Sequence, residues 1–146
     1  MRLLAALVLS GCLGPIAPDV GALETSDGGT ATCSNLDSDP AMPVSFGNDI
    51  LRGVFDRGRC IHCHTGGMGT QQSGLDLSSY SALRTGGGRS GPSIVVDAMP
   101  CQSVLVQKLE TSPPFGQRMP LDGPPYLADA DIQLVSDWIA EGADDN

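Results

Sequence analysis

Large aromatic side chains are scarce in this 146-residue chain, which contains 3 Phe, 2 Tyr and 1 Trp. Gly and Pro, by contrast, occur 19 and 11 times. A chain of this composition has few bulky side chains with which to fill a hydrophobic core. A bound prosthetic group could replace them, as metals and disulfides do in other domains with small cores. The length allows one domain of ordinary size and a tail.

Basic residues are also few. Eight Lys and Arg stand against 17 Asp and Glu, which gives a formal net charge of −9 at pH 7. The basic residues are scattered singly along the chain, whereas a protein that binds a phosphate backbone needs a basic stripe. This pattern argues against nucleic acid as a partner and against electrostatic adsorption to anionic lipid.

The first residues have the order of a secretory signal: Arg2, an apolar run from Leu3 to Leu9, and then Ser10-Gly11-Cys12. An apolar run of seven residues is too short to span a bilayer, which takes about 20. The run Leu9-Ser10-Gly11-Cys12 also resembles a bacterial lipobox, in which cleavage precedes a cysteine that is then acylated. We therefore expect residues 1–11 to be a signal peptide and Cys12 to carry a lipid anchor, with a plain signal peptide as the alternative. The mature protein would be periplasmic or at the cell surface.

Residues 12–43 mix proline with Gly, Ser, Thr, Asp and Ala and show no apolar periodicity. This composition is typical of a flexible tether. We assign residues 12–43 to the tether, 44–143 to a folded domain and 144–146 to an acidic tail.

The strongest chemical signal is Cys60-Ile61-His62-Cys63-His64, the C-x-x-C-H pattern of c-type haem attachment. Two thiols three positions apart lie on one side of a helical turn, so both can add to the vinyl groups of one porphyrin. His64 then stands where its imidazole can bind the iron from the proximal side. His62 is expected to be a surface residue. One covalent haem c is the predicted cofactor.

Competing interpretations of the motif are weaker. A zinc site needs four ligands, usually as two pairs, and only Cys33 and Cys101 could complete one. A redox dithiol would need a βαβ pattern around the motif, and none is visible. A structural disulfide between Cys60 and Cys63 would leave His64 without a role.

Cys33 and Cys101 are expected to form a disulfide in an oxidising compartment, which would fasten the end of the tether to the domain. Lipid, haem and bridge would then use all five cysteines. Two free buried thiols are the alternative.

The sixth iron ligand should be a thioether, because the chain has only two histidines and a His/Met pair suits electron transfer. Met119 lies in a proline-rich loop before the last predicted helix, where prolines limit the entropy lost on ligation. We favour Met119 over Met99. Met42 lies at the end of the tether, Met68 is too close to His64, and a methionine that simply packs in the core is the remaining alternative.

Four short helices are predicted from apolar spacing and end signals. Asn48 can cap the first, from Asp49 to about Arg57. The last has an apolar stripe made of Ile132, Val135 and Ile139, which we interpret as core. The predicted ranges are Asp49–Arg57, Tyr80–Arg84, Ser103–Leu109 and Asp129–Glu141.

The chain resembles the small monohaem class I c-type cytochromes, especially domains common in planctomycete and myxobacterial exported proteins. The matching stretches are Ser45–Ile50 leading to Cys60–His64, Gly74–Leu77, Ser103–Leu109, Arg118–Pro125 and Ile132–Ala143. The resemblance implies an all-α, cytochrome c-like domain wrapped around haem c, with His64 proximal and Met119 distal. Cys101 and the sparse basic residues depart from the pattern and put a lysine-ringed docking face in doubt.

These observations favour an electron carrier rather than an enzyme. Its acidic composition suggests redox partner proteins with a basic docking face, and salt-sensitive association. The alternative is a haem-based sensor or ligand-binding module in which the sixth position is open or Met119 is displaced. A small peroxidase ranks lowest, because no His is left to serve as a distal acid or base.

Overall fold

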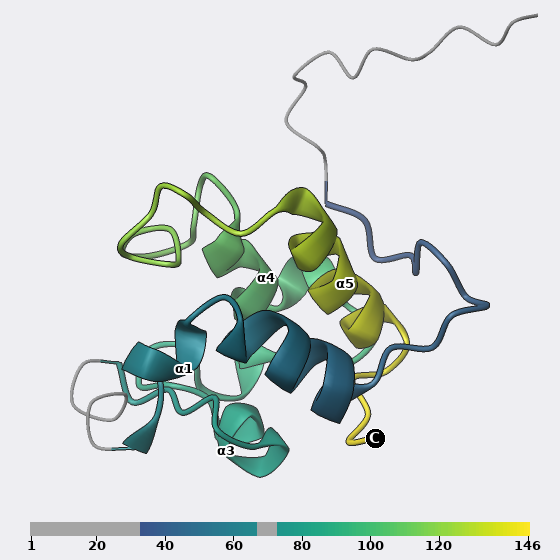
Figure 1. Cartoon of the computed structure of the whole chain (residues 1–146), viewed down its shortest axis with the longest axis horizontal. Helices are drawn as coiled ribbons and strands as arrows, with labels where there is room; N and C mark the ends of the chain where they lie inside the picture. The colour runs from purple at the N-terminus through teal and green to yellow at the C-terminus, as the bar shows by residue number, and fades with distance from the viewer. Residues whose placement is uncertain (1–32, 67–72) are drawn as a thin grey trace, which may run out of the picture. The chain divides into compact units, whose positions relative to one another are not determined.

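The computed structural model describes residues 33–66 and 73–146, and within them it contains helices and no strand (Figure 1). This agrees with the all-α prediction. None of the helices in these two ranges is long and apolar enough to cross a membrane. The predictions for the signal peptide, Cys12, residues 12–32 of the tether and Met68 lie outside the described residues. The elements are η1 (Phe46–Asp56), α1 (Cys60–Cys63), α3 (Tyr80–Thr85), η2 (Gly91–Ile94), η3 (Pro100–Gln102), α4 (Val104–Leu109) and α5 (Asp129–Ala140).

The first helix, η1, is a π-helix that begins three residues before the predicted start at Asp49. Its N-cap is Ser45, so the prediction of Asn48 as the cap is wrong. The Ser45 hydroxyl accepts a hydrogen bond from the Asn48 N–H, and the Ser45 N–H donates to the Asp49 carboxylate. This reciprocal pair gives hydrogen-bond partners to the N–H groups of Ser45 and Asn48, which lie at the start of the helix and have no acceptor within it.

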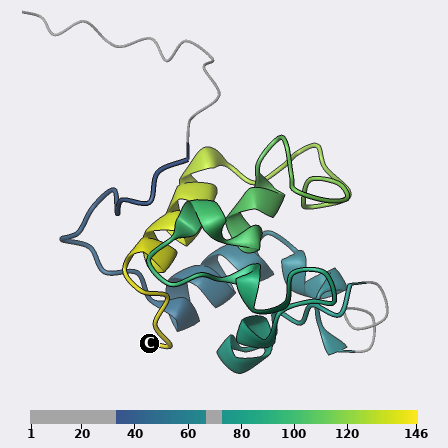
Figure 2. The ribbon, with the colours of Figure 1, turned by 180° about the vertical axis from the view of Figure 1, so that it is seen from behind.

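The core lies where η1 meets α5, two helices that run side by side in both ribbon views (Figures 1 and 2). Trp138 of α5 is 1% exposed, and its ring centroid lies 5.3 Å from that of Phe46 in η1. Tyr80 at the start of α3 packs edge-on against Phe46 at the same separation. Each such aromatic pair stabilises the fold by about 1 kcal/mol beyond the contribution of the apolar area that it buries. The predicted stripe of Ile132, Val135 and Ile139 is buried, which confirms the core interpretation of α5.

Three of the short elements between α1 and α5, namely α3, η2 and α4, each contribute one or two buried side chains to this core. α3 buries Leu83, η2 buries Ile94, and α4 buries Leu105, Val106 and Leu109. α3, α4 and α5 lie within two residues of their predicted bounds. The two 3-10 turns η2 and η3 were not predicted.

Residues 33–43, which we call the strap, lie beside α5. Ser38 of the strap donates two hydrogen bonds to the Asp137 carboxylate, from its backbone N–H at 2.9 Å and from its hydroxyl at 2.6 Å. Gln133 donates to the same carboxylate. Asp137 is buried, so these donors replace water around its charge. The composition of this stretch indicated a tether, yet its polar side chains bind specific partners on α5.

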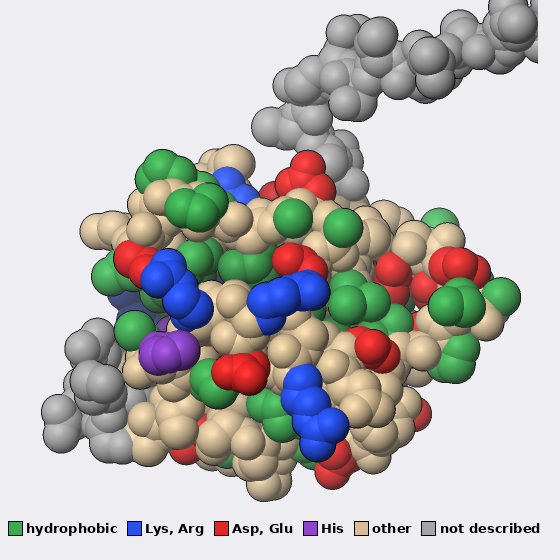
Figure 3. All heavy atoms as spheres, viewed as in Figure 1, with side chains coloured by type: hydrophobic (Ala, Val, Ile, Leu, Met, Phe, Trp, Pro, Cys, Tyr) green, Lys and Arg blue, Asp and Glu red, His purple; other side chains and the backbone are tan. Residues whose placement is uncertain are grey.

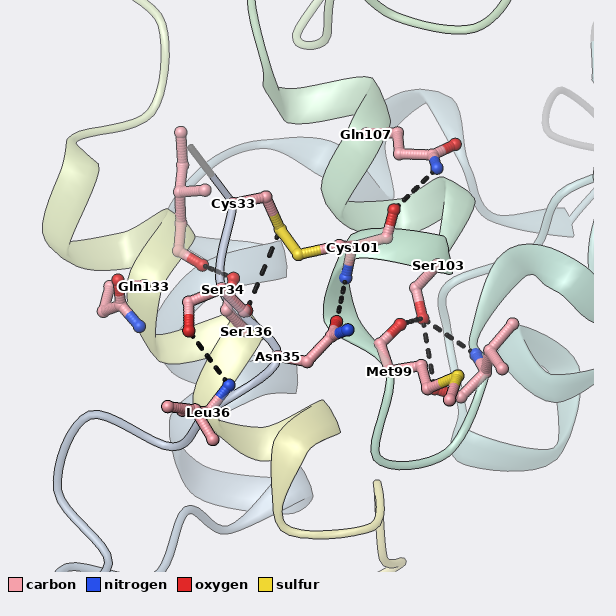
Figure 4. Close-up of a disulfide and its surroundings, with 12 residues drawn as sticks. Cys33, Ser34, Asn35, Leu36, Met99, Cys101, Ser103, Gln107, Gln133 and Ser136 are labelled. Carbon is pink, nitrogen blue, oxygen red and sulfur yellow. Dashed lines mark hydrogen bonds between the residues drawn. A yellow bond between two sulfur atoms is a disulfide. The ribbon is translucent and has the colours of Figure 1, made fainter. Parts of the chain in front are cut away.

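A disulfide joins Cys33 at the start of the strap to Cys101 in η3 (Figure 4). The Asn35 side chain accepts a hydrogen bond from the Cys101 N–H at 2.9 Å, and Gln107 of α4 donates to the Cys101 carbonyl at 2.8 Å. The strap is therefore joined to the η3–α4 segment by the disulfide and by hydrogen bonds around it.

Candidate functional site

A tight reversal leads from η1 into α1. A Cβ on Gly58 would lie 2.6 Å from the Val54 carbonyl oxygen, so only glycine fits there without a shift of the backbone. The next residue, Arg59, has φ 61°, a left-handed conformation that is uncommon for a residue with a side chain. Together the two residues turn the chain so that the four residues of α1 follow directly on η1.

α1 presents two free thiols on one turn. Cys60 is half-buried against the core, and this burial raises the pKa of its thiol to about 11. Cys63 is exposed. The His64 N–H donates to the Cys60 carbonyl at 2.9 Å, which closes the turn. The structure thus places both thiols of the predicted motif on one helical turn.

His64 follows the turn and is half-buried. Burial lowers the pKa of its imidazole, while a hydrogen bond with the Leu75 backbone opposes this shift. A neutral imidazole keeps the lone pair with which it can bind a metal. The His64 carbonyl accepts from the Leu77 N–H at 2.7 Å, and the Ser73 hydroxyl lies 3.4 Å from Nδ1. Residues 73–77 therefore fix the backbone and approach the ring, a role that sequence reasoning did not assign to them. His62 is exposed, as expected of a surface residue.

The loop that carries Met119 is tied to α4. The Met119 N–H donates to the Lys108 carbonyl at 2.8 Å, and the Arg118 side chain donates to the Leu109 carbonyl at 2.6 Å. Both acceptors lie at the C-terminal end of α4, where carbonyl groups lack helical partners. The Met119 side chain is half-buried.

The same loop also lies against the segment that leads into Cys60. Asp122 forms an ion pair with Arg59 at 2.6 Å. Leu127 approaches Gly58, whose Cβ position would be 3.5 Å from the Leu127 side chain. Between the two segments is a hollow of about 310 Å³, lined by Arg57, Gly58, Arg59, Pro120, Pro125, Tyr126, Leu127, Ala128 and Asp131.

The other methionines occupy different places. Met99 lies beside Cys101 and Ser103 (Figure 4), and its side chain is 46% exposed. Its neighbour Ala98 donates to the Ile139 carbonyl of α5. Met42 is in the strap and 68% exposed. Among the methionines of the described residues, Met119 is the one whose loop is joined to the segment before Cys60.

The donor set fits haem c. Two uncommitted thiols on one turn match the two vinyl groups that a porphyrin offers, and an imidazole follows them in the chain. The zinc interpretation needed Cys33 and Cys101 as further ligands, and the structure pairs these two with each other. In residues 33–66 and 73–146, no group of three or more His, Cys, Asp or Glu side chains is arranged to hold a metal ion.

Residues 60–122 match the family model of planctomycete cytochrome C. The matched stretch begins at Cys60 and ends at Asp122, so it contains the C-x-x-C-H turn, α4 and the Met119 loop. It covers less than half of the chain and supports a cytochrome c-like domain. No significant match was found among curated proteins or among solved structures. A cytochrome c domain implies haem c as the cofactor and electron transfer as its use.

Proposed function

We propose that this chain is an electron-transfer protein that carries one covalent haem c, with His64 and Met119 as axial ligands. The observation that carries the proposal is the free Cys60–Cys63 pair on one turn, followed by His64, at the start of the matched stretch. The haem would supply a one-electron Fe(II)/Fe(III) couple. We further propose that the protein is exported and tethered through Cys12, and that it has no substrate to turn over.

Each residue has a distinct task in this proposal. Cys60 and Cys63 would hold the porphyrin covalently, while the contacts of residues 73–77 fix the backbone at His64. The two hydrogen bonds from the Met119 loop to α4 fix the backbone of that loop, and they would keep the thioether in place beside a bound haem. A fixed ligand set keeps structural change small when the electron moves, and a His/Met pair raises the potential.

The first experiment is a haem stain after denaturing electrophoresis, with intact mass, on the chain made with cytochrome c maturation factors. We expect a mass increase of one haem that is absent in Cys60→Ala/Cys63→Ala. A matched control is Cys33→Ala/Cys101→Ala, which removes two cysteines from the disulfide and should retain the haem. A wild-type chain without covalent haem would contradict the proposal.

The distal ligand is tested by comparing Met119→Leu with Met99→Leu. Met119→Leu should lower the reduction potential and open the iron to rapid binding of carbon monoxide, while Met99→Leu should change neither. Rapid binding by the unaltered reduced protein would instead favour the sensor alternative, in which the sixth position is open or Met119 is displaced.

A further inference from the structure

Charge is distributed unevenly along the folded part of the chain. Residues 33–51 and 129–146 contain nine acidic side chains and no Lys or Arg, whereas residues 52–128 contain seven basic and five acidic ones. Figure 3 shows part of this division on one face: acidic side chains without Lys or Arg lie over the strap, whereas Lys and Arg side chains stand among acidic ones over η1 and α1. The net charge of −9 therefore does not describe the part of the molecule that holds the candidate haem site.

Three cations gather beside the Met119 loop, and we call Arg89, Lys108 and Arg118 the cation cluster. Arg89 and Lys108 approach the ring of Phe115, at 4.6 and 5.2 Å from its centroid. Burial, and to a smaller degree the positive charge of Arg89, lower the pKa of Lys108. Two like charges therefore stand around one aromatic ring, and an anion nearby would offset their repulsion.

Arg118 belongs to the same loop and donates to the carbonyl of Leu109, the neighbour of Lys108 in the chain. Its guanidinium lies 4.3 Å from the centroid of the Tyr126 ring. Tyr126 and Leu121 are exposed apolar side chains of the same loop. Arginine and aromatic side chains are the types enriched at the centres of protein interfaces.

The cation cluster has no acidic partner within the described part of the chain. Arg57, Arg59 and Arg84, by contrast, form ion pairs with Asp131, Asp122 and Asp97. The ammonium group of Lys108 donates to the carbonyls of Phe115 and Gln117, and Arg118 donates to Leu109. These backbone acceptors leave the positive charges uncompensated.

We propose that the cation cluster, with Phe115, Leu121 and Tyr126, is a docking surface for an acidic face of a partner protein. This inference rests on the proposed function, because the surface matters for electron transfer only if Met119 lies at the iron. It assigns to this face a partner of the opposite sign to the one that overall composition suggested. The acidic strap lies on the opposite side of the domain from this loop in both ribbon views (Figures 1 and 2), so it would be turned away from such a partner, and the charge separation would orient the encounter.

The test uses the exported, haem-loaded chain with Cys12→Ser, reduced and then mixed with hexacyanoferrate(III) in a stopped-flow instrument. One electron leaves the ferrous haem and converts this trivalent anion to hexacyanoferrate(II), with no proton transferred. If the cation cluster controls the approach, the second-order rate constant falls as ionic strength rises, in spite of the negative net charge. Arg89→Gln should lower the rate at low salt by about twofold to threefold, since solvent and salt partly screen the attraction between one exposed charge and the anion.

Two variants make the result specific. Arg89→Lys keeps the charge and should retain the rate. Arg52→Gln removes an exposed arginine of η1 that, among residues 33–66 and 73–146, likewise has no acidic partner and donates to Asn48, so it should leave the rate nearly unchanged. A rate constant that rises with salt, or an equal effect of Arg52→Gln and Arg89→Gln, would overturn the inference.

Two further outcomes are distinguishable. Binding to phosphatidylserine vesicles that is lost in Arg89→Gln, without an effect on the hexacyanoferrate rate, would point to a membrane surface and overturn docking of a protein. Absence of covalent haem would instead overturn the proposed function. In that case the binding of a polyglutamate peptide to the same variants, measured by calorimetry, still decides whether the cation cluster recognises acidic polypeptides.

Discussion

The strap, η1 and α5 differ sharply from the region that holds the candidate haem site. Half of the residues of α5 are buried, and the Phe46–Trp138 contact joins that helix to η1. In α1, by contrast, no residue is buried, and none is buried from Glu110 to Asp131. The first region is held by apolar packing and a disulfide, and the second by ion pairs and backbone hydrogen bonds. The protein thus separates the part that stabilises the fold from the part that would pack against a cofactor.

The largest expected effect on stability lies in the first region. Trp138→Ala should lower the free energy of unfolding by about 4 kcal/mol, because it removes a buried ring and leaves a cavity. Leu121→Ala is the matched change in the second region, where the side chain is 61% exposed, and should cost less than about 0.5 kcal/mol. Urea unfolding of the haem-loaded chain measures both. An equal loss of unfolding free energy in the two variants would contradict the difference between the two regions.

The disulfide should rank next. Cys33→Ser/Cys101→Ser opens a loop with a sequence separation of 68 residues. The chain-entropy model assigns such a loop up to about 4 kcal/mol, and typical native bridges contribute about 2–4 kcal/mol. Unfolding monitored by circular dichroism should show this loss, while the haem content stays at one. Ser38→Ala keeps the disulfide but removes the hydroxyl donor to Asp137, and it should lower the free energy of unfolding by about 1 kcal/mol. A disulfide variant as stable as the wild type would show that the polar contacts alone hold the strap.

Features that depend on local spacing could be predicted from the sequence in both regions. Local spacing is enough to place Cys60 and Cys63 on one turn, and the stripe of Ile132, Val135 and Ile139 is enough to define the buried face of α5. The predicted start of η1 was wrong because Ser45 and Asn48 are both good capping residues. Which of them caps the helix depends on the reciprocal hydrogen bond between Ser45 and Asp49.

Contacts between distant segments were harder to predict. The bonds from Ser38 to Asp137 and from Arg59 to Asp122 join residues 99 and 63 positions apart. Nothing in the local pattern of either segment identifies its partner. The composition of residues 33–43 is that of a tether, and only the partners on α5 distinguish an attached strap from a free one.

The two thiols of α1 should differ in reactivity in the haem-free chain. With its pKa raised from 9.0 to about 11, Cys60 is about one part in a thousand thiolate at pH 8. Cys63 is exposed, so iodoacetamide should label it at least about tenfold faster than Cys60, as measured by mass spectrometry of the Cys12→Ser chain. Labelling of Cys60 should rise with pH up to about 11. In urea its pKa returns towards the unfolded value, so the two rates should converge, and a difference that persists in urea would contradict burial as the cause.

The smallest effect on stability is expected at the Arg59–Asp122 pair, where the two segments of the site meet. The side chains are 60% and 62% exposed, and exposed pairs contribute under about 1 kcal/mol. Arg59→Gln and Asp122→Asn should therefore unfold at nearly the wild-type urea concentration. Their effect should be seen in ligation, because the pair joins the Met119 loop to the segment before Cys60. We expect carbon monoxide to bind the reduced haem faster in both variants than in Arg57→Gln, which removes the neighbouring ion pair to α5 and leaves the loop in place. Since the three variants lose similar surface charge pairs, faster binding in the first two alone would assign the difference to the position of Met119, and equal rates in all three would show that the loop is held by α4.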